Sequence, residues 1–203
     1  MKLKKAAAIL MAAAMTASLA ACGSSSSGEN SSGSSAGSDG TYTIGICQQM
    51  EHPALDAATE GFQDACKEKF GEDNVEFDVQ NAQGEQTMCS TIIINFVSSD
   101  VDLILANATL PLQTAAQATA DIPILGTSVT DFASALGISD WTGATGVNIS
   151  GTCDLAPIEE QEDMLTELLP EAKTVGILYC SAESNSKYQA ELFEAELEKD
   201  GIE

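Results

Sequence analysis

Short apolar runs alternate with longer amphipathic segments from Thr41 to the end of the 203-residue chain, and this alternation restricts the fold more than any other feature. Strands alternating with helices of this length are typical of βαβ units around parallel sheets, with right-handed crossovers that place helices on both faces. The sequence therefore predicts the α/β fold class. The runs that we interpret as strands span residues 42–47, 75–79, 101–106, 122–126, 145–148 and 175–179.

Apolar residues at helical spacing fill the intervals between these predicted strands. The first helix is expected to open at His52, because a proline follows it, and to end at Gly71. The second helix is expected to turn Met88 and Phe96 inward, together with the isoleucines between them. The predicted helices span residues 53–70, 85–97, 111–119, 158–168 and 184–199.

The predicted strands divide unevenly into two groups. Four or five of them complete one sheet before about residue 150, whereas the second group has one strand, its flanking helices and the first step of another strand at 202–203. A lone βα unit cannot cover its own apolar edge. We therefore expect a first lobe at 41–152 and the incomplete start of a second lobe at 153–203. The alternative is a single flavodoxin-like domain with a sixth strand.

The first forty residues predict a leader and a tether. Three lysines precede an alanine-rich apolar run, and Leu19-Ala20-Ala21-Cys22 fits the lipobox of bacterial lipoproteins. We expect a signal peptide at 1–21 and lipidation of Cys22; an ordinary signal peptide or a short membrane anchor are the alternatives. Nine serines and five glycines among residues 23–40 predict a flexible linker, so 22–40 would tether the protein to the outer face of the cell membrane.

Composition argues against several function classes. The chain has 31 acidic residues, eight lysines, no arginine and a net charge of −23, which excludes a basic nucleic-acid footprint. Its single histidine, His52, makes a His-based triad or a multi-His metal site hard to build. The nucleophile-elbow, P-loop and dinucleotide-binding motifs do not occur. We therefore expect no enzyme activity, cofactor or metal.

Five cysteines lie outside the lipobox, and their spacing fits no zinc site. Cys66 and Cys89 fall on apolar helix faces, where a thiol packs as a small apolar group. We therefore favour free thiols over a structural bridge. The five are Cys47, Cys66, Cys89, Cys153 and Cys180.

Ligands of open parallel sheets bind beyond the carboxyl ends of the strands. Helix N-termini at this edge would suit a carboxylate, and Asp131 or Glu51 could pair with an ammonium group, as an amino acid would require. Each candidate also has a local alternative: His52, Thr109 and Ser184 as helix caps, and Asp131 in an Asx-turn. The loops that follow the carboxyl ends of the predicted strands, and so are selected as ligand-binding loops, lie at 48–52, 107–111, 127–132 and 180–186.

Several short motifs occur in the order found in one family. The chain resembles the ABC transporter substrate-binding lipoproteins of the type I periplasmic-binding-protein fold, in the tryptophan/tyrosine-type branch, over essentially all of 42–203. The motifs are Ile44-Gly45-Ile46, Glu51-His52-Pro53-Ala54-Leu55-Asp56, Asn81-Ala82-Gln83-Gly84, Asp121-Ile122-Pro123-Ile124, Val129-Thr130-Asp131, Gly146-Val147-Asn148-Ile149-Ser150-Gly151, Leu168-Leu169-Pro170, Glu183-Ser184-Asn185-Ser186 and Gln189.

The resemblance implies two Rossmann-like lobes that close on a small ligand and deliver it to an ABC permease, with an aromatic or other amino acid as the expected ligand. The alternatives are a ligand sensor of the same fold that signals to a membrane partner and, less favoured, an anchored α/β hydrolase. By position, the first-lobe contacts implied are Gln48, His52, Thr109, Thr130 and Asp131, and those of the second lobe are Ser184, Asn185 and Ser186.

Overall fold

The computed structural model describes residues 40–203, so the predicted signal peptide, most of the linker and the lipidation site Cys22 lie outside the described residues. The strands are β1 (Tyr42–Gln48), β2 (Val75–Asn81), β3 (Leu103–Asn107), β4 (Ile124–Val129) and β5 (Ile149–Cys153). The helices are α1 (Pro53–Phe70), α2 (Gln86–Ser98), α3 (Thr109–Ala118), α4 (Phe132–Leu136), α5 (Ile158–Leu168) and α6 (Ser184–Lys199), with a 3-10 turn, η1 (Glu72–Asn74).

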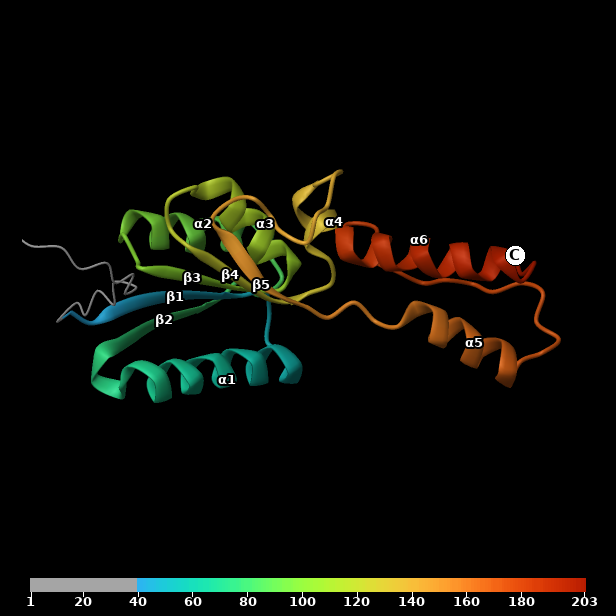
Figure 1. The fold of residues 1–203 in the computed structure, drawn as a ribbon, viewed down its shortest axis with the longest axis horizontal. Coiled ribbons are helices and arrows are strands. Elements are labelled where there is room, and N and C mark those ends of the chain that lie inside the picture. The colour runs from blue at the N-terminus through green and yellow to red at the C-terminus, as the bar shows by residue number, and fades with distance from the viewer. Residues whose placement is uncertain (1–39) are drawn as a thin grey trace, which may run out of the picture. The chain divides into compact units, whose positions relative to one another are not determined.

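The five strands form one parallel sheet in the order β2-β1-β3-β4-β5 (Figure 1). Ile46 of β1 pairs with Val79 of β2 on one side and Leu105 of β3 on the other. Since every pair is parallel, each strand is joined to the next by a crossover, and all four crossovers between the five strands contain a helix. The predicted α/β class with a parallel sheet is confirmed.

Helices cover both faces of this sheet, with α1 on one face and α2 and α3 on the other (Figure 1). Ile44, Ile46 and Leu105 form the core beneath α1, together with Cys66 from that helix. The second core contains alternate residues of the same strands and the inward side chains of α2 and α3. Because side chains alternate along a strand, central strands buried on both faces are apolar throughout.

Three local predictions need correction. The fifth strand lies at Ile149–Cys153 and not at 145–148, because Gly143 and Gly146 adopt left-handed backbone angles that belong to a loop. Helix α3 begins at Thr109, two residues earlier than predicted. Met88 is 43% exposed and does not face inward, because the next residue, Cys89, lies on the side of the helix that packs against the core.

The predicted strand at 175–179 is extended chain without a strand ladder. Its end is held by two backbone bonds only: Val175 N donates to Glu203 O at 2.7 Å, and Glu203 N donates to Lys173 O at 2.9 Å. Leu178 is fully exposed. Among residues 40–203 this segment therefore does not form the predicted strand, because a strand needs a partner along its length. Helices α5 and α6 pack against each other beside this segment.

Candidate functional site

The parallel sheet brings the predicted first-lobe residues to one edge. Gln48 and Asn107 end β1 and β3 as paired neighbours, and Asn107 pairs with Thr127 near the end of β4. The segments that leave this edge lead directly into α1, α3 and α4. His52, Thr109, Thr130 and Asp131 therefore lie on successive loops of the same edge, although up to 83 positions separate them from Gln48 in the sequence.

The Gln48 side chain is buried, and all of its amide hydrogens are engaged within the protein. Its Nε2 donates to Met50 O at 2.8 Å and to Asp56 Oδ1 at 2.6 Å. Its Oε1 accepts a hydrogen bond from Thr59 Oγ1 at 2.7 Å. Gln48 therefore holds the β1–α1 loop and the first turns of α1 in place, and its amide has no spare donor for a ligand.

Asn107 extends this network to β3. Its Nδ2 donates to Leu55 O at 2.8 Å and to Thr59 Oγ1 at 2.9 Å, so the Thr59 hydroxyl bridges Asn107 and Gln48. Asn107 is fully buried, and its Oδ1 has no hydrogen-bond partner among the described residues. An orphaned buried oxygen of this kind costs about 1–3 kcal/mol. The sequence analysis selected the loop that begins at Asn107 without singling out that side chain, and it missed Thr59, which lies within the predicted helix at 53–70.

His52 and Asp131 both cap helices. His52 precedes α1, and its Nδ1 accepts a hydrogen bond from Ala54 N at 3.2 Å. Asp131 precedes α4, and its Oδ1 accepts one from Ser134 N at 2.6 Å. The capping alternative is therefore confirmed for His52, whereas Asp131 caps α4 in place of the predicted Asx-turn, because its carboxylate accepts from the N–H three residues on. His52 is exposed and Asp131 is half-buried, so both side chains remain accessible from the edge of the sheet.

The predicted caps at Thr109 and Ser184 are wrong, because both are the first helical residues and the capping positions precede them. The α3 cap is Ala108, which has φ 110° and ψ 172° and no side-chain acceptor. This backbone region is rarely adopted by residues other than glycine and costs about 1–3 kcal/mol, which is typical of binding and switch regions. Thr109 and Thr130 are buried beside this edge.

Two glutamine side chains connect the start of α6 to the edge of the sheet. Gln113 Nε2 donates to Ser184 Oγ at 3.1 Å and to Ala135 O at 2.9 Å. Gln49 Nε2 donates to Glu183 Oε1 at 3.4 Å. The structure therefore places the start of α6 beside α3, α4 and the β1–α1 loop, with Asn185 and Ser186 following in the first turn of α6. Neither glutamine was singled out from the sequence.

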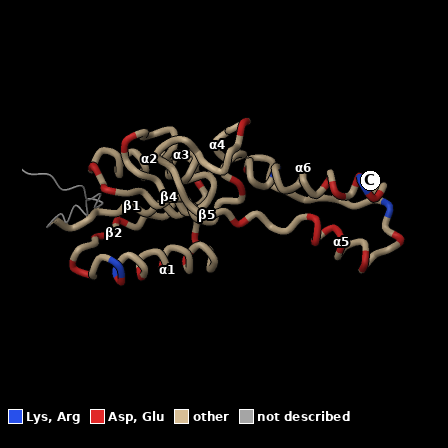
Figure 2. The backbone as a smooth tube through the Cα atoms, in the orientation of Figure 1, with Lys and Arg blue, Asp and Glu red and all other residues tan. Residues whose placement is uncertain are grey.

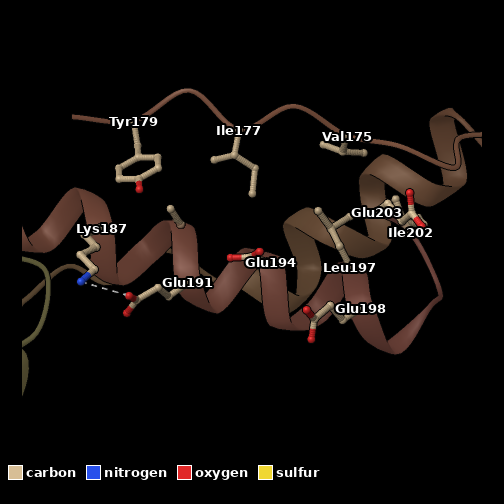
Figure 3. Close-up of a pocket in the computed structure, with 11 residues that line it drawn as sticks. Val175, Ile177, Tyr179, Lys187, Glu191, Glu194, Leu197, Glu198, Ile202 and Glu203 are labelled. Carbon is tan, nitrogen blue, oxygen red and sulfur yellow. Dashed lines mark ion pairs between the residues drawn. The ribbon is translucent and has the colours of Figure 1, made fainter. Parts of the chain in front are cut away.

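The cavities near these residues are shallow and separate. Gln48 lines one of about 460 Å³ with Asp56 and Thr59, and Ser186 lines another of about 400 Å³ with Tyr179 and Gln189. A groove of about 380 Å³ lies between the extended segment at 175–179 and α6, and it contains none of the eight predicted residues (Figure 3). In that groove the apolar side chains of the segment face α6, whose Glu191 pairs with Lys187 at 3.5 Å.

Acidic positions outnumber basic ones along the described backbone, and they include residues of α1, α5 and α6 (Figure 2). One of them, Glu162, is buried, and burial together with the nearby negative charges of Asp200, Asp163 and Glu196 raises the pKa of its carboxyl. Within residues 40–203, no cluster of three or more His, Cys, Asp or Glu side chains is placed to hold a metal ion. No helix in that same range is both long and apolar enough to cross a membrane.

The five cysteines outside the lipobox are thiols in the structure. Cys66 and Cys89 are buried, as their positions on apolar helix faces predicted, and Cys47 is buried as well. Cys153 and Cys180 are exposed.

Comparisons with known proteins find relatives that are similar in sequence and in fold. A family model described as ABC transporter substrate binding protein matches residues 43–203. A curated tyrosine-binding protein of Clostridioides difficile is 41% identical over 150 residues, which cover 73% of this chain and 43% of that protein. The crystal structure of an ABC domain in complex with L-Trp, from Streptococcus pneumonia, has 35% identity and a TM-score of 0.74, covering 80% of this chain and 55% of that one.

A conserved domain protein from Vibrio cholerae has 34% identity and the same TM-score of 0.74, again covering 80% of this chain and 55% of its own. The chain therefore spans about half the length of the relatives it matches.

Proposed function

Because this chain belongs to the ABC transporter substrate-binding protein family, we propose that it captures an amino acid and delivers it to an ABC permease. Its solved relatives are type I periplasmic binding proteins, which is the fold that the sequence resemblance predicted. One curated relative is named for binding tyrosine, and one solved relative is a complex with L-Trp. These two ligands favour an aromatic amino acid. The relatives are binding proteins, and the proposal includes no enzymatic reaction.

The observation that carries this proposal is the meeting of α6 with the carboxyl edge of the sheet. The Gln113–Ser184 and Gln49–Glu183 hydrogen bonds hold the first turn of α6 beside the loops that end β1, β3 and β4. A ligand at this edge would therefore contact the sheet-bearing lobe and α6 together. Such a position supports capture between two parts of the chain.

The chemistry of the edge suits a zwitterion. The first turns of α3 and α6 have backbone N–H groups without helical partners, and such groups bind a carboxylate. Asp131 supplies a carboxylate for the ammonium group, since its capping bond uses only Oδ1. Among the eight predicted contacts, Gln48 is the least suited to a direct one, because its amide hydrogens hold Met50 and Asp56. We propose it as a positioning residue.

The proposed mechanism is lobe closure. A ligand that contacts both the sheet edge and α6 stabilises the state in which they are close, in proportion to its differential affinity for that state. The permease would then recognise this closed state. We further propose that Cys22 anchors the protein by a lipid on the outer face of the cell membrane, and that residues 22–40 act as the tether.

Thermal unfolding of the 203-residue chain with each standard amino acid tests the ligand. At 100 times its dissociation constant, a ligand adds about 2.7 kcal/mol to the stability of the folded state. We expect tryptophan, tyrosine or phenylalanine to raise the melting temperature by several degrees. The absence of a shift with every amino acid would overturn the assignment.

A pair of variants tests the site. Asp131→Asn keeps an oxygen that can cap α4 but removes the charge, so we expect the ligand-induced shift to disappear while the stability without ligand changes little. Asp73→Asn, on the exposed turn η1, is the matched control and should keep the shift.

Uptake of the labelled amino acid by cells with and without the gene separates an importer from a sensor. Unchanged uptake would favour the sensor.

A further inference from the structure

Two buried thiols lie in contact although 42 positions separate them in the sequence. Cys47 Sγ and Cys89 Sγ are 3.7 Å apart. Cys47 belongs to β1 and Cys89 to the first turns of α2, and neither residue is exposed to solvent. The contact therefore joins β1, an interior strand between β2 and β3, to a helix that covers the sheet.

The surroundings of the two thiols differ. Cys89 Sγ also donates to Thr114 Oγ1 of α3 at 3.5 Å, and Thr114 in turn donates to Leu110 O at 2.8 Å. The hydrogen bond with Cys47 lowers the pKa of Cys89 to about 7, whereas the same bond and burial raise the pKa of Cys47. Of the two thiols, Cys89 is therefore the one that loses its proton more easily, and thiol–disulfide exchange begins with a thiolate.

The geometry is close to that of a bond. A disulfide places its sulfurs about 2.05 Å apart, so the two Sγ atoms need to approach by about 1.7 Å. Rotation of the two side chains is the movement that the proposal requires for this approach. Cys66 provides a contrast: it is also buried, but it lies in the core on the other face of the sheet, with Ile44 and Ile46. Burial raises the pKa of its thiol.

We propose that Cys47 and Cys89 are a disulfide-forming pair that links β1 to α2 when the chain meets a small-molecule disulfide. The Cys89 thiolate attacks the small disulfide, releases one thiol and leaves a mixed disulfide on Cys89. Cys47 then loses its proton and its sulfur attacks Cys89 Sγ, which releases the second thiol. Two cysteine thiols are oxidised to one disulfide, and the small disulfide is reduced to two thiols.

Burial determines when this exchange takes place. Because neither residue is exposed, the small disulfide reaches Cys89 during folding or when α2 opens locally, and the finished bond is then shielded from reductants. The bond closes a long loop of chain, which restricts the unfolded state. It also fixes the end of β1 immediately before Gln48. This inference rests on the core of the sheet-bearing lobe and is independent of the proposed ligand.

The experiment refolds the 203-residue chain with oxidised glutathione, alkylates the remaining thiols in denaturant and maps the peptides by mass spectrometry. Cleavage after acidic residues yields the peptides 40–51 and 86–100, each with a single cysteine, Cys47 or Cys89. We expect these two peptides to be joined, with the mass of the pair reduced by two hydrogen atoms and the link lost on reduction. Recovery of both peptides in the alkylated form, or joined to other cysteines, would overturn the proposal.

Variants and stability give the second measurement. Cys66→Ala, which removes a buried thiol from the other face, should keep the linked peptides, whereas Cys89→Ala should lose them. The oxidised wild type should melt roughly 5–15 °C above the reduced protein. Equal melting temperatures for the linked and reduced forms would overturn the stabilising role. If Cys89→Ala does not fold, the peptide map of the wild type still decides whether the bond forms.

Discussion

Gln113 and Ser184 are 71 positions apart in the sequence, yet the Gln113 amide donates a hydrogen bond to the Ser184 hydroxyl at 3.1 Å. The same Nε2 donates to Ala135 O of α4 at 2.9 Å. One side chain of α3 therefore holds the start of α6 and the end of α4 at the edge where the ligand is proposed to bind. Ligand affinity should depend on this side chain even without direct contact.

We expect Gln113→Leu to lower stability by about 1–3 kcal/mol, because it removes two hydrogen bonds that each contribute about 0.5–1.5 kcal/mol. Gln117→Leu, one turn further along α3 and exposed, is the matched control and should change stability by less than about 0.5 kcal/mol. Urea unfolding measures both. Equal effects of the two substitutions would mean that the Gln113 bonds contribute nothing.

Because the Thr59 hydroxyl bridges Gln48 and Asn107, we expect Thr59→Val to lower the free energy of unfolding strongly. Valine has the shape of threonine but no hydroxyl, so buried polar atoms of both neighbours would lose their partner, at a cost of about 1–3 kcal/mol each. Thr91→Val is the control, because the Thr91 hydroxyl is exposed and bonds only to Thr87 O within its own helix. Denaturant unfolding should separate the variants clearly, and a mild effect of Thr59→Val would contradict the network.

His52 can be tested as a cap and as a ligand contact separately. His52→Ala should destabilise the protein by about 0.5–2 kcal/mol, because Ala54 N loses its acceptor. His52→Asn should restore stability, since asparagine is a favoured cap. If the imidazole also contacts the ligand, His52→Asn will keep stability and lose affinity, as measured by calorimetric titration. Full affinity in the asparagine variant would leave His52 with the capping role alone.

Alanine substitutions at two glycines, Gly45 and Gly61, are expected to change stability in opposite directions. A Cβ on Gly45 would lie 2.7 Å from the Phe96 ring, so Gly45→Ala should destabilise the protein by about 1–3 kcal/mol through overpacking. Gly61 lies within α1 with no atom within 4 Å of the added Cβ, so Gly61→Ala should stabilise it by about 0.4–1 kcal/mol. Thermal unfolding of both variants tests the fit between β1 and α2, and a stable Gly45→Ala protein would contradict it.

We expect Glu162 to make the folded protein less stable as the pH rises. Its folded pKa is raised above the ordinary value of 4.5, so the folded state binds the proton more tightly than the unfolded state does. Stability from this group is therefore present below about pH 4.5 and decreases as the pH rises toward the folded pKa. Glu162→Gln should reduce this slope, measured by urea unfolding at a series of pH values. An unchanged slope would show that Glu162 does not cause it.

Local patterns predicted much of the fold. The apolar runs of β1 to β4 and the helical spacing of α1, α2 and α6 indicated the correct element types, and the N-terminal boundary of α6 was predicted correctly. The parallel order followed from the alternation of strands and helices. The errors fell where local pattern is weak, as at Gly143 and Gly146, or where a strand requires a distant partner, as at 175–179.

The amino-acid sequence alone determined the α/β class, because that class depends on periodicity and on the alternation of strands and helices. It also predicted the sheet edge and the loops at which we propose that a ligand binds, because these follow from the direction of parallel strands. Only the tertiary structure decided what the side chains at that edge do. It engaged Gln48 in a buried network, used His52 and Asp131 as caps, and placed Cys47 against Cys89. Such contacts join residues far apart in the chain, and their partners depend on packing that no local pattern contains.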